Sequence, residues 1–404
     1  MERFAKQNDT TLMVPFVYLL NPNFPLLSAS VWKVNVSLYP LIIHIGASIN
    51  CYTGLLSRKK VLKSPLLVQM LFNKVQKKLL MSMNLCKEVG ELAHSVLFKI
   101  ILVTIIIISI VAIALEIWVM FKTTIHILVH QNTRILIITH QLWLIFHCIG
   151  RIFTHTYVLL AYQKTYADLC EYMTFPWECF MIRTPITLTL FLNAASIAAI
   201  VTERAIATYF SSKYEKFGRS VAVILVIVQL TIGIGSFLFL VSNFDLLGPE
   251  KVVYCSTGNA ANAMKSAIVF GFYMTIDFIS ALIFPVLFCI NKQFHRSKIH
   301  VNLSHRYQIT ENINSLQTLS PMVAFHSLCL AFYLGALFMY FVVDFKFSHK
   351  QFAIYLESVQ QTPIYALTLP IALVWTEKYV RKTTQENRRK AIELKGHEAA
   401  NHYF

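Results

Sequence analysis

The chain has 404 residues, of which 56% are hydrophobic and only 14% are charged. A soluble domain carries about 25% charged residues, so this composition argues against a soluble enzyme. With 12 Gly and 12 Pro, the chain is neither collagen-like nor a low-complexity disordered segment. We expect a multi-pass membrane protein whose first partner is the lipid bilayer. The positive-inside rule then accounts for a net charge of +16 without any need for nucleic acid.

Seven apolar segments follow one another from residue 96 onward. A helix that crosses a bilayer needs about 20 mostly apolar residues, and each segment is long enough. The segments are too long and too continuous for the strands of a membrane barrel, so we predict an all-α, seven-transmembrane helix bundle. The predicted spans are Val96–Phe121, Ile135–Leu160, Thr184–Tyr209, Ser220–Phe244, Ser266–Ile290, Pro321–Val343 and Phe352–Trp375.

The distribution of Lys and Arg predicts how the bundle is oriented. Basic residues gather in the segments that follow the first, third, fifth and seventh predicted spans. Because basic loops stay in the cytoplasm, we expect the segment before the first span outside the cell and the C-terminus inside. The predicted domains are an atypical extension (1–80), a seven-transmembrane domain (81–376) and a basic cytoplasmic tail (377–404).

The first 80 residues fit this topology poorly. They carry 10 Lys and Arg against 2 acidic residues, and Pro40 and Gly46 interrupt the apolar stretch Leu38–Leu56. An eighth span there would invert every later helix against the charge rule. The stretch also lies too far from Met1 for a cleaved signal peptide. Two interpretations stay open: a segment that does not belong to the native protein, or a genuine extension.

Four cysteines, Cys86, Cys170, Cys179 and Cys255, fall outside the membrane in this topology. Four thiols that face an oxidising compartment permit two disulfides in three pairings. A Cys179–Cys255 bond would hold the loop after the fourth span over the mouth of the bundle. A Cys86–Cys170 bond would then tie the N-terminal segment to the first outer loop. Four unpaired thiols are the less attractive alternative.

Charged side chains occur within predicted spans, where burial in lipid is costly and function is the default explanation. Arg151 lies in the second span and Asp277 near the middle of the fifth. The two could pair with each other or face a ligand, and a fixed polar contact that only supports the bundle explains them equally well. Glu203 and Arg204 end the third span, where an Arg held by an acid can be released when helices separate.

The sequence lacks the usual motifs of enzymes and metal sites. His126 and His130 stand four residues apart, a spacing that can bind metal, but no HExxH motif or carboxylate–His cluster accompanies them. There is no GxSxG, no P-loop GxxxxGK and no GxGxxG that opens a helix. We therefore expect no enzyme, no metal and no cofactor, and we assign these histidines to the core or to the membrane interface.

Short motifs stand at the ends of the predicted spans. The most specific is RYQITEN at 306–312, in the third inner loop. The others are ERAIAT at 203–208, DLC at 168–170 followed by Cys179 and Arg183, and His130-Gln131-Asn132 before the second span. Together these motifs resemble the nematode serpentine chemoreceptors of class alpha and class alpha/beta, over about Leu85 to Lys382.

This resemblance implies a G-protein-coupled receptor for small environmental molecules, expected in the plasma membrane of sensory neurons and often at the cilium. Its partners would be a small-molecule ligand and a heterotrimeric G protein; an oligomer with itself or with another receptor is left open. The sequence departs from rhodopsin-like receptors, because the sixth span lacks CWxP and the seventh lacks NPxxY. The switch and coupling residues implied are Glu203, Arg204, Arg306, Tyr307, Gln308, Glu311 and Asn312.

A ligand pocket is expected between the helices on the outer side, under the loop around Cys255. Ligand binding there would bias a two-state bundle, with the response at the inner end. A seven-helix ligand-gated channel with its N-terminus in the cytoplasm and a transporter are the alternatives, and topology separates the channel from the receptor. The predicted pocket residues are Arg151, His155, Tyr273, Asp277 and Glu357.

Overall fold

The structure is a computed structural model, and it forms two compact units, Met1–Met81 and Ser82–Phe404. The extension 1–80 discussed above, Gln76 apart, lies outside the described residues. Everything below concerns the second unit. The structure describes Gln76, 83–126, 130–211, 213–242, 251–256, 262–297, 303–343, 345 and 347–402.

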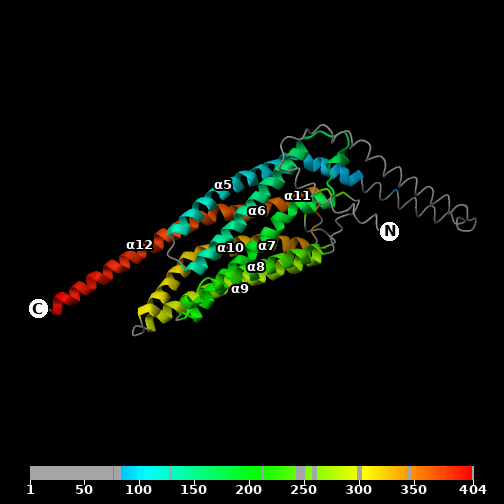
Figure 1. Cartoon of the computed structure of the whole chain (residues 1–404). Coiled ribbons are helices and arrows are strands. Elements are labelled where there is room, and N and C mark those ends of the chain that lie inside the picture. The colour runs from blue at the N-terminus through cyan, green and yellow to red at the C-terminus, as the bar shows by residue number, and fades with distance from the viewer. Residues whose placement is uncertain are drawn as a thin grey trace, which may run out of the picture. The chain divides into compact units, whose positions relative to one another are not determined.

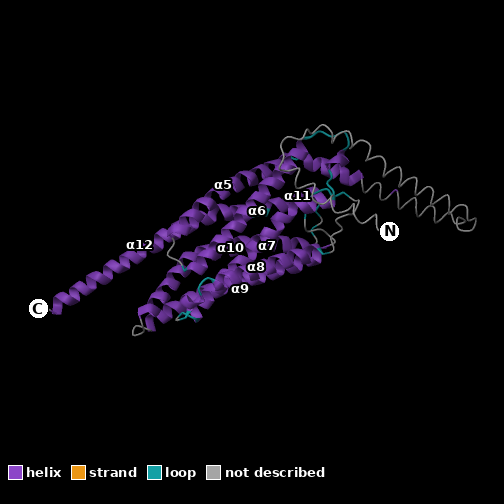
Figure 2. Ribbon diagram, in the orientation of Figure 1, coloured by secondary structure: helices purple, strands orange, loops and turns teal. Residues whose placement is uncertain are grey.

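The described part of the second unit is a bundle of long helices (Figures 1 and 2), which confirms the predicted all-α fold. Residues 83–93 are helical and precede the bundle. Two 3-10 helices occupy Leu169–Tyr172 and Tyr214–Phe217. The α-helices are α5 (Val96–His126), α6 (Gln131–Gln163), α7 (Pro176–Tyr209), α8 (Ser220–Val241), α9 (Ala263–Ser297), α10 (Leu303–Val343), α11 (His349–Ser358) and α12 (Thr362–His402).

Helices α5 to α10 are each long and apolar enough to cross a membrane. The seventh long helix, α12, packs against α5 and α10, and its apolar first half is followed by a basic second half. Around the bundle, α5 contacts α6, α6 contacts α7, and α9 contacts α10. Helix α7 also contacts α8, α9 and α10, so it is the central and most buried helix.

The predicted seventh span, Phe352–Trp375, is wrong as a single helix. The chain forms α11, leaves the helix at Val359 and begins α12 at Thr362. Pro363 explains the break, because its ring disfavours helical geometry at the preceding residue and fits the first turn of a new helix. The break leaves α11 as a short helix, and Glu357 lies near its end.

The prediction of a loop before the sixth span is also wrong. Helix α10 begins at Leu303, so the RYQITEN sequence forms its first turns. Ile309, Leu316 and Leu319 recur at helical spacing and are buried, which stabilises this extension against the bundle. Pro321, where the span was expected to begin, lies inside the helix and removes only one backbone hydrogen bond.

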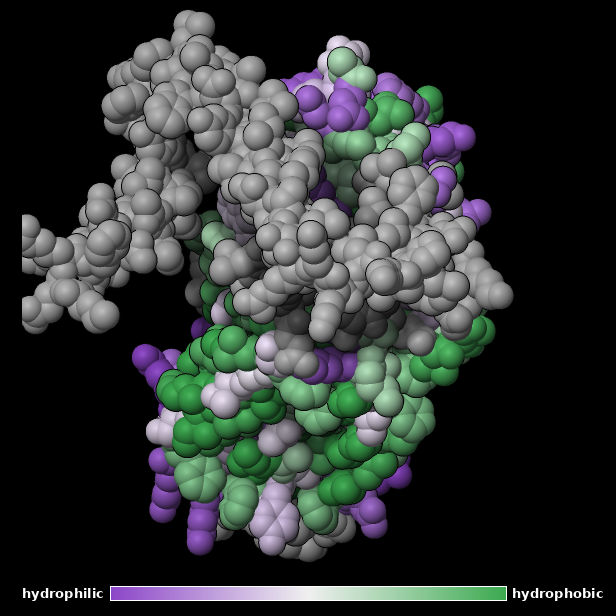
Figure 3. All heavy atoms as spheres, turned by 90° about the vertical axis from the view of Figure 1, so that its right-hand side faces the viewer, coloured by the Kyte–Doolittle hydropathy of each residue, from purple (hydrophilic) through white to green (hydrophobic). Residues whose placement is uncertain are grey.

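Packing inside the bundle is tight, whereas its flanks are apolar. A Cβ atom on Gly233 of α8 would lie 2.6 Å from Cδ2 of Leu192 of α7, so a larger residue there would force the Leu192 side chain to move. Figure 3 shows one face on which hydrophobic side chains cover much of the bundle, with hydrophilic ones at its margins. Exposed Val, Ile, Leu and Phe side chains on α5, α8 and α9 form the surface expected to contact lipid.

Candidate functional site

Two disulfides define one end of the bundle, which we call the disulfide end. Cys86 bonds to Cys170 and Cys179 bonds to Cys255, with Cα–Cα distances of 4.6 and 4.9 Å. Of the three pairings that the sequence allowed, the structure contains this one. Because Cys179 lies in the first turn of α7, the second bond holds residues 251–256 against the start of that helix.

An antiparallel bridge positions the same segment. The backbone N–H of Val252 donates to the carbonyl of Thr174 at 2.9 Å, and the N–H of Thr174 donates back at 3.2 Å. The bridge lies three residues before Cys255, so Tyr254 is fixed on both sides. Its hydroxyl group points into the bundle, where it donates a hydrogen bond to Glu357.

At the disulfide end, four buried side chains from α6, α7 and α11 and the half-buried Tyr254 of the 251–256 segment form what we call the arginine–glutamate cluster. Arg151 Nη1 lies 2.8 Å from Glu357 Oε2, and Arg183 Nη2 lies 2.7 Å from Glu357 Oε1. His155 Nε2 is 3.5 Å from the same carboxylate, and Arg183 donates to the hydroxyl of Tyr254. One carboxylate thus joins three helices and a loop.

The charges of this cluster do not balance. Burial opposes ionisation of Glu357, but the two guanidinium groups of Arg183 and Arg151 outweigh it, so its pKa lies below the ordinary value. Burial raises the pKa of Tyr254, and its phenol remains a neutral donor. Two cations and one anion leave one excess positive charge in a desolvated site, an arrangement that favours an added anion.

Two polar atoms of the cluster also lack partners. Arg183 Nε and His155 Nδ1 are buried and make no hydrogen bond among the described residues. An unsatisfied buried donor costs about 1–3 kcal/mol, so each atom would gain from a ligand or a water molecule. The site therefore has unused capacity to donate hydrogen bonds as well as excess positive charge.

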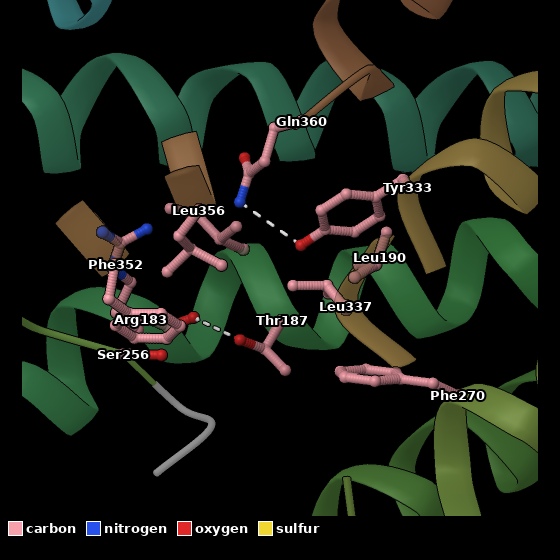
Figure 4. Close-up of a pocket in the computed structure, with 11 residues that line it drawn as sticks. Arg183, Thr187, Leu190, Ser256, Phe270, Tyr333, Leu337, Phe352, Leu356 and Gln360 are labelled. Atoms are coloured by element: carbon pink, nitrogen blue, oxygen red, sulfur yellow. Dashed lines mark hydrogen bonds between the residues drawn. The ribbon is translucent and has the colours of Figure 1, made fainter. Parts of the chain in front are cut away.

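A cavity of about 40 Å³ adjoins Arg183. In Figure 4, Arg183 and Ser256 lie toward one side of it, and the rings and chains of Phe270, Leu190 and Leu337 lie toward the other. Tyr333 accepts a hydrogen bond from Gln360 at 3.3 Å across the top of the view. Ligand pockets usually measure about 300–1,000 Å³, so this cavity is too small as it stands for a typical ligand.

The structure brings together three of the five predicted pocket residues, Arg151, His155 and Glu357. The other two lie elsewhere. Tyr273 donates to Ser236 at 3.1 Å and stacks on the ring of Phe191. Asp277 is 3.2 Å from His326 in the middle of the bundle.

The suggested Arg151–Asp277 pair is wrong, because Arg151 pairs with Glu357. Sequence reasoning also missed Arg183 and Tyr254. Arg183 was placed just outside the predicted third span, whereas α7 begins at Pro176 and carries Arg183 inside the helix. The signal that could have identified Arg183 was its charge next to an apolar run that forms a helix.

A second polar cluster lies between the two ends of the bundle. His140 is 2.5 Å from Ser196 Oγ and 2.8 Å from the hydroxyl of Tyr365. The ring of His326 packs edge-on against Tyr365, with ring centres 5.1 Å apart. This cluster links α6, α7, α10 and α12 around a cavity of only about 10 Å³.

At the opposite end, which we call the Arg204 end, a buried network surrounds Glu203 and Arg204. Arg204 donates to both oxygens of Glu203, at 2.5 and 2.6 Å, and to Asn312 Oδ1 of α10 at 3.0 Å. Thr133 of α6 and the hydroxyl of Tyr214 donate to Glu203 as well. The Arg204 network therefore joins α6, α7 and α10.

Asn312 is the cross-helix contact of this network. Its Nδ2 atom donates to Thr208 of α7 and to Asn291 of α9, each at 2.9 Å. Burial and the neighbouring Glu203 carboxylate raise the pKa of Tyr214, so its phenol stays a donor. Loss of the Asn312 side chain would remove the hydrogen bonds that join α10 to both α7 and α9 at this end.

The remaining predicted coupling residues lie beside the network. Gln308 and Glu311 line a cavity of about 20 Å³ next to Arg204 and Tyr214. Arg306 and Tyr307 lie near the start of α10, and their side chains lie outside what the structure describes. Sequence reasoning assigned no role to Thr133, Tyr214 or Asn291, which are uncharged, although Tyr214 follows the ERAIAT motif.

Comparison with known proteins identifies the family of this chain. Residues 83–404 match the family model described as serpentine type 7TM GPCR receptor class ab chemoreceptor. Serpentine receptor class alpha/beta-14 of Caenorhabditis elegans is 27% identical over 62% of this chain, and serpentine receptor class alpha-39 of the same organism is 26% identical over 41%. The matches span 66% and 44% of the lengths of these relatives. The chain belongs to the serpentine class ab chemoreceptors, a family of seven-transmembrane receptors.

Proposed function

We propose that this protein is a chemosensory G-protein-coupled receptor that binds a small molecule at the disulfide end and couples to a heterotrimeric G protein at the Arg204 end. Its place would be the plasma membrane of a sensory cell, at the cilium. The family supports the receptor, and the excess of basic residues near the Arg204 end supports a cytoplasmic location for that end. Disulfides at the other end suit an oxidising exterior.

The observation that carries the site assignment is the excess positive charge of the arginine–glutamate cluster. Arg151 and Arg183 face one carboxylate, and Arg183 borders the cavity. A carboxylate on the ligand would supply the missing negative charge and satisfy donors that have no partner. The apolar wall of Leu190, Phe270 and Leu337 would contact the rest of the molecule. We therefore assign the ligand to the class of small apolar carboxylic acids.

Binding would change the contacts that close the bundle. A carboxylate that takes one guanidinium group from Glu357 weakens the link between α6, α7 and α11. Such differential contact is what allows a ligand to shift a two-state equilibrium. The second state would have Arg204 released from Asn312, with α10 displaced from α7. The inner surface so opened, which includes Gln308 and Glu311, would receive the G protein.

Short-chain carboxylic acids test the assignment. Cells that express the full chain with a G-protein reporter are given butyric and hexanoic acids, and the alcohol and amine of each carbon skeleton. We expect responses to the acids alone, and loss of these responses in Arg183→Gln. Surface expression and the reporter response to a co-expressed reference receptor are the controls. Equal responses to alcohols or amines, no response to any acid, or an acid response that survives in Arg183→Gln would overturn the assignment.

A further inference from the structure

An apolar groove of about 410 Å³ opens on the flank of the bundle between α9, α10 and α12. Its volume lies within the range of about 300–1,000 Å³ that is usual for ligand sites, unlike the small cavity beside Arg183. The groove is remote from the arginine–glutamate cluster, since its walls belong to the halves of the three helices nearer the Arg204 end. The side chains that form its apolar walls are Phe284, Phe288, Leu316, Pro321, Trp375 and Val380.

Aromatic side chains place one edge of the groove at the membrane interface. Trp375 and Tyr379 of α12 are 72% and 65% exposed, and both line the groove. Trp and Tyr are enriched at the level of lipid headgroups, where one side of the ring contacts hydrocarbon and the other contacts water. The groove thus extends from the level of the lipid headgroups toward the hydrocarbon region of the membrane, where Phe284 forms part of its wall.

Exposed lysines lie within one helical turn of groove-lining residues on α9 and α12. Lys378 and Lys382 follow Trp375 and Tyr379 by three residues each on α12, and both are exposed. Lys292 follows Phe288 by one turn of α9 and is exposed too. None of these three lysines forms an ion pair within the described part of the chain.

Neither neighbouring acidic residue of α12, Glu377 or Glu386, forms an ion pair with these lysines among the described residues. Glu377 is almost buried, and its Oε1 atom pairs with Arg381 at 2.7 Å. The polar edge of the groove therefore keeps its positive charge. The rest of the groove is apolar and opens on the flank of the bundle. An amphipathic molecule with a negative head and a hydrocarbon tail matches both features.

We propose that this groove binds one anionic phospholipid. One acyl chain lies against Phe284, Phe288 and Trp375, and the headgroup contacts Lys292, Lys378 and Lys382. Each basic residue near an anionic bilayer surface contributes about 1 kcal/mol, so three lysines distinguish an anionic headgroup from a zwitterionic one. The assignment of the lipid to the cytoplasmic leaflet rests on the proposed function. The binding of the lipid in the groove does not depend on it.

The bound lipid would contact the helix that holds the Arg204 network closed. Leu316 lines the groove and lies one turn after Asn312, the residue that joins α10 to Arg204. A lipid wedged between α9, α10 and α12 therefore acts on the part of α10 whose displacement is expected on signalling. The lipid composition of the membrane would tune this receptor through that contact.

Photocrosslinking tests the site. The full chain is reconstituted in vesicles that contain a trace of phosphatidylserine or phosphatidylcholine with a photoactivatable acyl chain, in both leaflets. Adducts are mapped by peptide mass spectrometry. We expect phosphatidylserine adducts to concentrate on the groove peptides of α9, α10 and α12, and phosphatidylcholine adducts to be weaker there by about fivefold or more.

Two variants and a matched control make the result specific. The double variant Lys378→Glu, Lys382→Glu should reduce the phosphatidylserine adducts at the groove by about fivefold or more, since two favourable charges are reversed. Ser320→Trp should reduce adducts of both lipids there, because Ser320 is exposed in the groove and the indole fills it. The control Lys213→Glu, Lys216→Glu changes the same charge in the segment between α7 and α8 and should have no effect.

Several results would overturn the proposal. Adducts spread evenly over the lipid-facing residues of α5 and α8 would show that the groove holds no preferred lipid. Equal adducts from the two lipids, or equal losses in the control variant, would show that the lysines do not select the headgroup. Because both leaflets carry the probe, these outcomes do not depend on membrane orientation or on G-protein coupling. Failure of the proposed function would therefore leave the crosslinking pattern unchanged.

Discussion

At the scale of single residues, Glu357 is the carboxylate on which the arginine–glutamate cluster is centred. Its carboxylate pairs with Arg151 and Arg183 and accepts a hydrogen bond from Tyr254. These three residues come from different parts of the chain. A buried carboxylate in this position stabilises the fold chiefly by preventing two buried cations from standing alone. The same carboxylate is the group with which an acidic ligand would compete, so stability and recognition depend on one side chain.

Glu357→Gln should lower the free energy of unfolding by about 3–5 kcal/mol, because it leaves two buried guanidinium groups without a counter-charge. The matched control is Glu91→Gln, whose carboxylate is half exposed and lies 3.7 Å from Lys350. An exposed pair contributes about 0–1 kcal/mol, so the control should unfold almost as the parent does. Thermal unfolding of the purified proteins in one detergent compares them. Equal unfolding temperatures for Glu357→Gln and the parent would show that the cluster is not held by charge.

The pH dependence of the same measurement follows from the sign of the pKa shift. The pKa of Glu357 is lowered in the folded state, so its contribution is complete above the ordinary carboxyl pKa of about 4.3 and is lost as the pH falls through the folded value. The difference in stability between the parent and Glu357→Gln should therefore shrink under acid conditions. A difference that grows on acidification would contradict the shift.

At the scale of helices, α7 connects the two ends of the molecule. It carries Arg183 at the disulfide end and Arg204 at the other, 21 residues and about 31 Å apart along one helix. Between them, Thr189 contacts His147 and Ser196 contacts His140, both of α6. A shift of α7 against α6 would therefore change polar contacts along its whole length.

Asn312→Leu should raise signalling without ligand, because it removes the contact that holds α10 to Arg204. A hydrogen bond to a charged group contributes about 1.5–3 kcal/mol, which corresponds to about a tenfold to hundredfold change in the ratio of open to closed states. Asn314→Leu, on the same helix but outside the network, is the control. Basal G-protein activation is measured at equal surface expression. Unchanged basal activity in Asn312→Leu, or an equal rise in Asn314→Leu, would remove Asn312 from the switch.

The same helices show what a sequence can and cannot predict. Long apolar runs identified the cores of α5 to α10, because crossing a bilayer imposes both length and hydropathy. The start of α10 at Leu303 was not predicted, because residues 303–320 mix polar and apolar side chains and their helix is stabilised by packing. The break before α12 falls in a short polar run that ends at Pro363, between the apolar residues of α11 and those of α12.

The candidate site was predictable as a set of unusual residues, not as a set of partners. Arg151, His155 and Glu357 were each conspicuous as ionisable groups near apolar segments. Arg151 and Glu357 are 206 residues apart, so only the packing of α6 against the α11 region determines that they pair. Tyr254 was unpredictable for the same reason, since the Cys179–Cys255 bond and the Thr174–Val252 bridge bring it over the site.

At the scale of the whole molecule, three of the buried polar groups among the described residues follow one another along the apolar bundle. The arginine–glutamate cluster lies at the disulfide end, the His140–Tyr365 cluster lies between the ends, and the Arg204 network lies at the opposite end. Apolar cores fill the space between them. This arrangement suits a receptor, because a ligand at one end and a partner at the other would share helices α6, α7 and α10.

The proposed receptor requires that the disulfide end faces the exterior and that the Arg204 end faces a cytoplasmic G protein. Epitope tags placed after Asn84 and at Phe404, read by antibody in intact and permeabilised cells, test it most directly. We predict that the Asn84 tag is detected in intact cells and that the Phe404 tag is detected only after permeabilisation. A Phe404 tag exposed in intact cells, with the Asn84 tag hidden, would contradict the receptor and favour a channel of inverted topology.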